Sequence, residues 1–315
     1  MKSKMYQKTI LRPISCTGIG VHSGEPAVVT LNPAPENYGI VFQRTDIKAS
    51  SKETLIPARW QYVKRGDFST KISNTFGHSI STIEHLMAAA AGYGITNLHI
   101  EVSGPEVPIM DGSAAPFLFL MECAGIKVQE AFQRYIKILK KITVRSDYGW
   151  ASLSPARNFS AEATINFRAH EGMEEQSFQS SDLQECFREE IARARTYGFV
   201  TDIEKLRAAG LARGGSLDNA VVFDKGTILN PEGLRFENEC VRHKVLDMIG
   251  DLFLAGSPIL GHFEGKNFGH ALNFDLLKAL FSDGAAWMFH SLSSTSSEGP
   301  PATALFRIPR NIAVA

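Results

Sequence analysis

The chain contains 315 residues, of which 44% are hydrophobic and 21% charged, and 33 basic residues balance 33 acidic ones. This composition is ordinary for a globular protein of about two domains, and it excludes collagen, coiled-coil and disordered chains. A chain without net charge has no global field to hold a polyanion, so the composition disfavours nucleic acid as a partner.

The sequence shows no signal for export or for a membrane span. Residues 1–10 are basic but lack the apolar core of a signal peptide. The most apolar stretch, residues 86–95, is too short to cross a bilayer. The four cysteines form no CxxC pair, which predicts free thiols in a reducing compartment. We therefore expect a cytoplasmic, monomeric protein without a transmembrane segment.

The first 125 residues have the patterns of strands and of helices that follow them. Concentrations of β-branched and aromatic residues predict strands at residues 27–31, 39–43 and 97–102. Ser81 and Glu84 have the spacing of a capping box before an Ala/Leu/Met run, which predicts a helix over residues 82–91. A second predicted helix opens at Asp111 and is closed by Gly125.

From about residue 128 the strand pattern returns, and helices follow it again. Strands are predicted at residues 136–144, 150–154, 160–167, 220–223 and 259–263. Helices are predicted at the capping-box forms 181–184 and 201–204, over the strongly apolar residues 241–255, and over residues 273–281. Residues 291–301 have the composition of a flexible loop before a last strand at 303–308.

Both halves of the chain therefore run from a strand meander to a helix, a glycine-containing break, a strand and a second helix. This coarse repeat predicts an α+β fold of two similar domains, each a mainly antiparallel sheet with helices on one face. The boundary is expected near residues 127–133, which gives an N-terminal domain of residues 1–129 and a C-terminal domain of residues 130–315.

The predicted helix over residues 241–255 carries three polar residues on an otherwise apolar sequence. His243, Asp247 and Asp251 recur at i, i+4 and i+8, so they lie along one stripe of the helix. A His and an Asp one turn apart can reach a single metal ion. A buried His–Asp hydrogen bond and a solvent-facing polar stripe are the alternative interpretations.

Three other segments hold residues with catalytic chemistry. Glu84 and His85 are adjacent at a helix start and diverge by about 100° around its axis, so one can bind metal while the other reaches a nearby water. His270 follows a glycine between a predicted strand and a helix. Arg193 and Arg195 lie at a predicted helix end. Each has a structural alternative: a capping-box acid, a solvated loop histidine and ordinary C-terminal helix charges.

Taken together, six segments in this order resemble the UDP-3-O-acyl-N-acetylglucosamine deacetylase family, the zinc enzymes of lipid A synthesis in Gram-negative bacteria. They are GIGVHSG (18–24), STIEHL (81–86), PIMDGSAAPF (108–117), ARTYGF (194–199), HKVLDMIGD (243–251) and GHALN (269–273). The resemblance covers nearly the whole chain from about Thr9. It implies hydrolysis of the N-acetyl group of UDP-3-O-acyl-N-acetylglucosamine, with helices packed between the two sheets.

The resemblance also implies a role for individual residues. The zinc ligands would be His85, His243 and Asp247, with Fe²⁺ as an alternative metal in the cell. The catalytic groups would be the general base Glu84, a protonated His270, its partner Asp251, the active-site Lys244, and Thr196 beside the tetrahedral intermediate. A β-α-β insert at residues 199–222 would form an acyl passage, so the residues expected to bind substrate are Tyr197, Phe199, Ile203, Leu206 and Gly215.

A departure from the family pattern before GHALN and two rival functions accompany this resemblance. A lysine and a small residue commonly precede GHALN in the family, but Asn267 and Phe268 stand there and Lys266 lies one place earlier. The sequence therefore assigns a phosphate contact to neither Lys266 nor Asn267. A zinc amidohydrolase for another N-acetyl sugar and a non-catalytic protein that binds an acylated carrier stay open. A structural zinc site usually includes Cys, and the candidate ligands do not.

Overall fold

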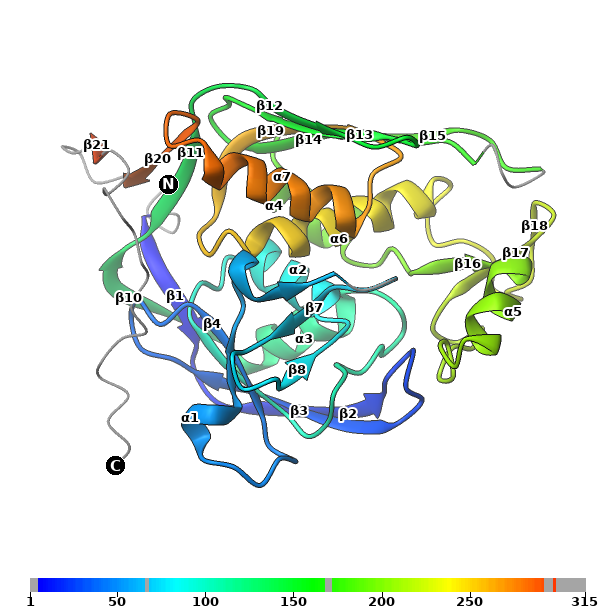
Figure 1. The fold of residues 1–315 in the computed structure, drawn as a ribbon, viewed down its shortest axis with the longest axis horizontal. Helices are drawn as coiled ribbons and strands as arrows, with labels where there is room; N and C mark the ends of the chain where they lie inside the picture. The colour runs from blue at the N-terminus through cyan, green and yellow to red at the C-terminus, as the bar shows by residue number, and fades with distance from the viewer. Residues whose placement is uncertain (1–4, 66–67, 168–171, 292–296, 299–315) are drawn as a thin grey trace.

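The computed structural model describes residues 5–65, 68–167, 172–291 and 297–298. Two sheets face each other across a layer of helices, which confirms the predicted α+β class (Figure 1). Within the described ranges, no helix combines the length and the apolar composition that a bilayer span requires. The predicted strand 303–308 and most of the predicted loop 291–301 lie outside the described residues.

The first half of the chain builds a five-stranded sheet. Its strands are β2 (Ile14–Ile19), β3 (Pro26–Pro33), β4 (Ile40–Arg44), β5 (Leu55–Pro57) and β9 (Leu98–Val102). They pair in the order β2–β3–β9–β4–β5, and only β4 and β9 are parallel. Side chains alternate along β3, so Ala27, Val29 and Leu31 face the core.

The described residues of the same half contain four helices and a small second sheet. The helices are α1 (Ser51–Thr54), a 3-10 helix (Trp60–Tyr62), α2 (Glu84–Tyr93) and α3 (Ala115–Ala124). The small sheet consists of β6 (Val63–Lys64), β7 (Lys71–Ser73) and β8 (Ser79–Ile80). Gly94 ends α2 with a φ of 76°, a left-handed conformation that glycine adopts without strain.

The second half builds the opposite sheet around one long strand, β19 (Ile259–Lys266), which pairs with β11, β13 and β14. The other strands are β11 (Arg134–Ile138), β12 (Ile142–Arg145), β13 (Trp150–Ser154), β14 (Phe159–Ile165), β15 (Gln176–Ser180), β20 (Trp287–Ser291) and β21 (Ser297–Glu298). The single strand predicted at 136–144 is wrong. The chain changes partner strands there, and Lys140 and Lys141 occupy the turn as ion-pair partners of Asp283 and Glu264.

The helices of this half are α4 (Leu183–Cys186), a π-helix (Phe187–Ile191), α5 (Val200–Ala208), α6 (Glu239–Phe253) and α7 (His270–Ser282). Two capping predictions are wrong here. Asp182 rather than Ser181 caps α4, because its carboxylate accepts the amides of Gln184 and Glu185. No side chain caps α5, which starts one residue before the predicted Thr201. In addition, α7 begins at His270, so this residue lies on a first helical turn rather than in a loop.

A strand pair connects the halves, and a small unit stands apart from both large sheets. Strand β10 (Ile126–Phe132) pairs with β1 (Tyr6–Ile10), and the expected domain boundary at 129/130 falls within β10. The division into two domains remains a prediction. Beyond the second sheet, β16 (Tyr197–Phe199), α5, β17 (Val221–Asp224) and β18 (Thr227–Ile228) form a separate small unit, seen at the right of Figure 1.

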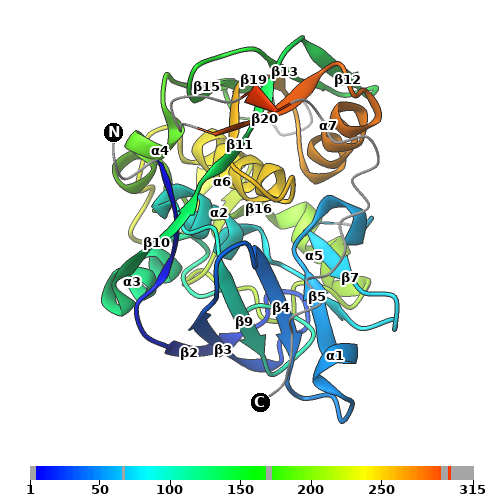
Figure 2. The ribbon, with the colours of Figure 1, turned by 90° about the vertical axis from the view of Figure 1, so that its left-hand side faces the viewer.

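The two halves meet where α2 packs against α6, in the middle of the helix layer (Figure 2). Gly250 of α6 makes the closest approach: a Cβ at this position would lie 2.1 Å from the carbonyl oxygen of Glu84. Only glycine lets the two backbones come this close. The start of α2 is thereby held against α6, and both helices carry the residues that the sequence singles out.

Candidate active site and metal centre

Helices α2 and α6 bring the three predicted metal ligands together. One potential ligand atom from each of His85, His243 and Asp247 lies within 4.8 Å of the other two, and all three residues are buried. Asp247 Oδ1 is 3.3 Å from His243 Nε2 and 3.6 Å from His85 Nε2. Lys244 Nζ lies 3.5 Å from the other carboxylate oxygen of Asp247.

The residues of this cluster are arranged as a metal would require. The carbonyl of Ala194 is 3.0 Å from His243 Nδ1 and accepts its N–H, which leaves the Nε2 lone pair facing Asp247. Asp247 Oδ1 is buried without a hydrogen-bond partner among the described residues. A buried carboxylate oxygen is costly unless something compensates it. A divalent cation between the three side chains would do so, and two imidazoles with one carboxylate form a familiar ligand set.

Burial and neighbouring charges give these residues the protonation states of ligands. Burial lowers the pKa of His243 to about 4, despite the opposing effect of Asp247, so its imidazole is neutral. Burial would raise the pKa of Asp247, but His243, His85 and Lys244 outweigh it and hold that pKa well below its usual range. A neutral imidazole and an ionised carboxylate are the forms that bind metal.

Beside this cluster lies a second group built around two carboxylates. His270 Nε2 is 3.8 Å from Glu84 Oε1, and His270 Nδ1 donates to Asp251 Oδ2 at 2.8 Å. The Thr70 hydroxyl donates to Asp251 Oδ1 at 2.5 Å, and the Asn273 amide donates to Asp251 Oδ2 at 2.8 Å. The Asp251 carboxylate therefore holds the imidazole of His270 on the Glu84 side.

The environment raises the pKa values of both Glu84 and His270. Burial raises the pKa of Glu84 to about 7, although His270 and His85 partly offset it. Burial would lower the pKa of His270, but Asp251 outweighs it and raises that pKa to about 9. Between these values an ionised carboxylate faces an imidazolium, the pairing expected of a general base and an electrophilic partner.

The capping box predicted for Ser81 and Glu84 is wrong. Ile83 is the N-cap residue of α2 and no side chain caps the helix. The Glu84 carboxylate instead accepts the backbone N–H of Thr70 at 3.1 Å. This contact orients the carboxylate toward His270.

Two residues of the site have no role assigned from the sequence. Thr70 donates its amide to Glu84 and its hydroxyl to Asp251, and so links the two carboxylates. No pattern around Thr70 in the sequence indicates this role. Asn273 lies one turn after His270 within the GHALN segment, so the motif itself could have indicated it.

The ARTYGF segment borders the metal cluster from the second half of the chain. Arg195 is not a helix-end charge: it is buried and pairs with Glu239 at the start of α6, at 2.9 Å. That pair places Ala194 where its carbonyl meets His243. Thr196 follows in a half-buried position, with its amide bonded to the carbonyl of Gly112 at 2.8 Å. Arg193, in contrast, is exposed.

The residues predicted to bind the acyl chain lie on the small unit beyond the sheet. The Tyr197 ring is 6.4 Å from the ring of His243 and 6.2 Å from that of Phe199, which extends the site along β16. Ile203 packs on Gly198 and, like Leu206, is half-buried. The carbonyl of Gly215 lies 3.4 Å from the guanidinium of Arg207, so Gly215 belongs to the surroundings of α5.

The two candidate phosphate contacts are engaged elsewhere. Lys266 forms an ion pair with Glu175 at 2.9 Å, and both side chains are exposed. Asn267 accepts the amide of Asn166 at 2.6 Å and donates to the carbonyl of Tyr148 at 3.2 Å. Asn267 thus holds a turn, whereas the Lys266 ammonium remains accessible.

Comparisons with known proteins point to one family. Residues 7–282 match the family model described as UDP-3-O-acyl N-acetylglycosamine deacetylase. A protein named UDP-3-O-acyl-N-acetylglucosamine deacetylase from Shewanella frigidimarina is 46% identical over 284 residues, 90% of this chain and 92% of the relative. One with the same name from Myxococcus xanthus is 48% identical over 281 residues, 89% of this chain and 88% of the relative.

Proposed function

The chain belongs to the UDP-3-O-acyl N-acetylglycosamine deacetylase family, and we propose that it uses one divalent metal ion held by His85, His243 and Asp247. It is a hydrolytic N-deacetylase of lipid A biosynthesis: water cleaves the N-acetyl amide of a UDP-3-O-acyl-N-acetylglucosamine and gives acetate and a free amine. The buried Asp247 Oδ1, without a partner among the described residues, is the observation that supports the metal most directly.

The proposed metal is Zn²⁺, with Fe²⁺ as the alternative in the cell. Two imidazoles and one carboxylate leave a coordination position open, as catalytic rather than structural zinc sites do. The ion would supply Lewis acidity to the amide carbonyl and make the attacking water more acidic.

The proposed roles of the remaining residues follow from their contacts. Glu84 takes a proton from the attacking water, since its carboxylate is buried beside the metal cluster and its pKa is about 7. His270, held protonated by Asp251, stabilises the oxyanion and donates the proton that the leaving nitrogen needs. Lys244 adds a positive charge at the edge of the same site, and Thr196 adds a hydroxyl there.

The acyl chain is proposed to follow the small unit that begins at β16. Tyr197, next to His243, and Phe199 provide an aromatic wall, and the half-buried Ile203 and Leu206 continue it on α5. An apolar wall of this kind favours a substrate that carries a 3-O-acyl group over the unacylated sugar.

Metal analysis and a deacetylation assay of the purified chain test this proposal together. We expect one metal ion per chain, release of acetate from the 3-O-acyl substrate, and very little from UDP-N-acetylglucosamine. Equal turnover of both substrates would indicate a different N-acetyl sugar deacetylase. Metal without turnover of either would indicate a binding protein. The cytoplasmic location and the monomeric state remain predictions, which cell fractionation and light scattering can check.

A further inference from the structure

One cavity lies at the C-terminal ends of α2 and α6, and none of the metal ligands lines it. Its volume is about 390 Å³, within the range of small-molecule sites. The C-terminal ends of α2 and α6, the start of α4, β11 and the start of β19 surround it. His85 and His243 lie near the beginnings of α2 and α6, so the cavity and the active site share two helices but none of the active-site residues described above.

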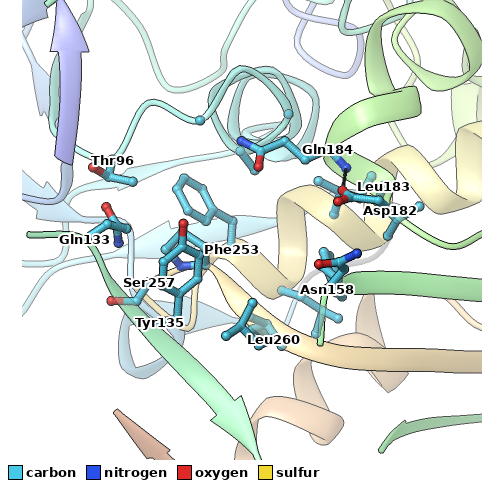
Figure 3. Close-up of a pocket in the computed structure, with 18 of the residues that line it drawn as sticks. Thr96, Gln133, Tyr135, Asn158, Asp182, Leu183, Gln184, Phe253, Ser257 and Leu260 are labelled. Atoms are coloured by element: carbon cyan, nitrogen blue, oxygen red, sulfur yellow. Dashed lines mark hydrogen bonds between the residues drawn. The ribbon is translucent and has the colours of Figure 1, made fainter. Parts of the chain in front are cut away.

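The floor of this cavity, which we call the junction pocket, is apolar. Ile249, Leu252 and Phe253 of α6 are at most 7% exposed, and Leu183 of α4 is 1% exposed. Figure 3 shows Phe253 between the side chains of β11 and those of α4, with Leu260 beside it. A ligand would therefore gain free energy mainly by covering apolar surface.

One polar atom of a residue that lines the junction pocket is an acceptor without a hydrogen-bond donor among the described residues. Gln133, 5% exposed, lines the junction pocket, and its Oε1 is buried without a hydrogen-bond partner among the described residues. Its Nε2 donates to the carbonyl of Arg134 at 2.6 Å, which fixes which amide atom is the acceptor. A buried acceptor without a donor is costly, so a ligand that supplies one is favoured. Figure 3 shows Gln133 on the same side of the pocket as Thr96 and Ser257.

The charges around the junction pocket balance. Lys8 and Arg157 carry positive charge, and Asp182 and Glu185 carry negative charge. The Asp182 carboxylate already accepts two amides at the start of α4. Because neither sign is in excess, the lining favours an uncharged ligand over an anion or a cation.

From the apolar floor, the balanced charge and the acceptor on Gln133, we propose that the junction pocket binds an uncharged, mainly apolar small molecule with one hydroxyl or amide donor. The donor bonds to Gln133 Oε1 and the apolar body covers Leu252 and Phe253. Binding there does not compete with the substrate, because none of the metal ligands and none of the catalytic residues lines the junction pocket. This site does not depend on the proposed deacetylase mechanism.

Three matched probes test the chemical class. 2-Naphthol has an apolar body and a hydroxyl donor, 2-methoxynaphthalene lacks the donor, and 2-naphthoate replaces it with a negative charge. We expect calorimetry or ligand-detected NMR on the full chain to give the tightest binding for 2-naphthol. The methyl ether should bind about threefold to tenfold more weakly, the worth of one neutral hydrogen bond, and the carboxylate more weakly still.

Variants locate the binding. Gln133→Met removes the acceptor at similar length, and should bring the affinity for 2-naphthol down to that for the ether. Leu260→Trp should fill the pocket and abolish binding of both, with Ala91→Leu as a second filling variant. Leu139→Trp, an identical change outside the pocket, should leave binding unchanged. Thermal unfolding and deacetylase activity of each variant verify that it is folded.

Four results would overturn the proposal. The first is equal affinity of the wild-type chain for 2-naphthol and its methyl ether, which would show that the ligand donates no hydrogen bond to Gln133. The second is binding that survives both filling variants. The third is no binding by any of the three probes. Displacement of 2-naphthol by the UDP-sugar substrate would also overturn it, because the probe would then occupy the active site.

Discussion

The paired helices α2 and α6 and the small unit of β16, α5 and β17 differ in how firmly the fold holds them. Thirteen of the 15 residues of α6 are buried, whereas no residue of α5 is. The metal ligands and the general base Glu84 lie in the first region, and the side chains expected to meet the acyl chain lie in the second. Reacting groups need fixed geometry, while an acyl chain needs only an apolar surface. Substitutions in the two regions should therefore have separable effects.

The largest effect should come from removing a metal ligand in the helix pair. We expect Asp247→Ala to lose both the bound metal and activity toward every substrate, while circular dichroism shows the helices intact. Asp283→Asn, which alters a surface carboxylate far from the cluster, is the control. Full metal occupancy in Asp247→Ala would remove this residue from the ligand set.

The general base should be separable from the metal. Glu84→Gln keeps the shape of the side chain and can still accept the Thr70 amide, but it cannot take a proton. We expect metal content to be unchanged and kcat to fall by about 10²–10⁴-fold, the usual contribution of acid–base catalysis. A variant that keeps wild-type kcat would contradict the assigned role.

The close packing of the helix pair should be needed for stability as well. Gly250→Ala places a methyl group against the Glu84 carbonyl, 2.1 Å away, so the helices must separate. We expect a loss of about 1–3 kcal/mol in the free energy of unfolding, as for other overpacked sites, measured by urea denaturation. Gly284→Ala, where no atom lies within 4 Å, should change stability little.

A change in the small unit should affect specificity alone. Leu206→Asp removes a half-buried apolar side chain from α5. Loss of contact with about two methylenes corresponds to roughly a tenfold lower kcat/KM for the acylated substrate. The low rate on unacylated UDP-N-acetylglucosamine should stay the same. Ala208→Asp, an exposed position on the same helix, is the control, and an equal effect there would show that charge rather than contact matters.

The smallest expected effect is a shift of the pH profile. Activity needs an ionised Glu84 and a protonated His270, so kcat/KM should rise through the pKa of the first and fall through that of the second, about 9. Asp251→Asn removes the carboxylate that stabilises the imidazolium. The descending limb should then move to lower pH by roughly one to three units. An unmoved limb would show that another group controls it. Asp275→Asn, a half-buried carboxylate of α7 that pairs with Arg65 rather than with His270, is the control.

Residue spacing predicts the position of side chains well where all the residues of the pattern lie on one helix or strand. The spacing of His243, Asp247 and Asp251 predicts that they share one stripe of a helix, and all three are buried on α6. The pattern fails where a side chain has two local uses. Ser81 and Glu84 fit a capping box, yet Glu84 turns to Thr70, because a buried base is held by tertiary contacts that spacing cannot reveal.

The sequence by itself determined the α+β class, the helix with the polar stripe and, through six ordered segments, the family. Only the tertiary structure decided that Thr70 joins the two carboxylates, that Arg195 is buried against Glu239, and that α7 begins at His270. The physical reason is the same in each case. Periodicity and spacing report which face of one element is buried, whereas these contacts depend on which other elements pack against that face.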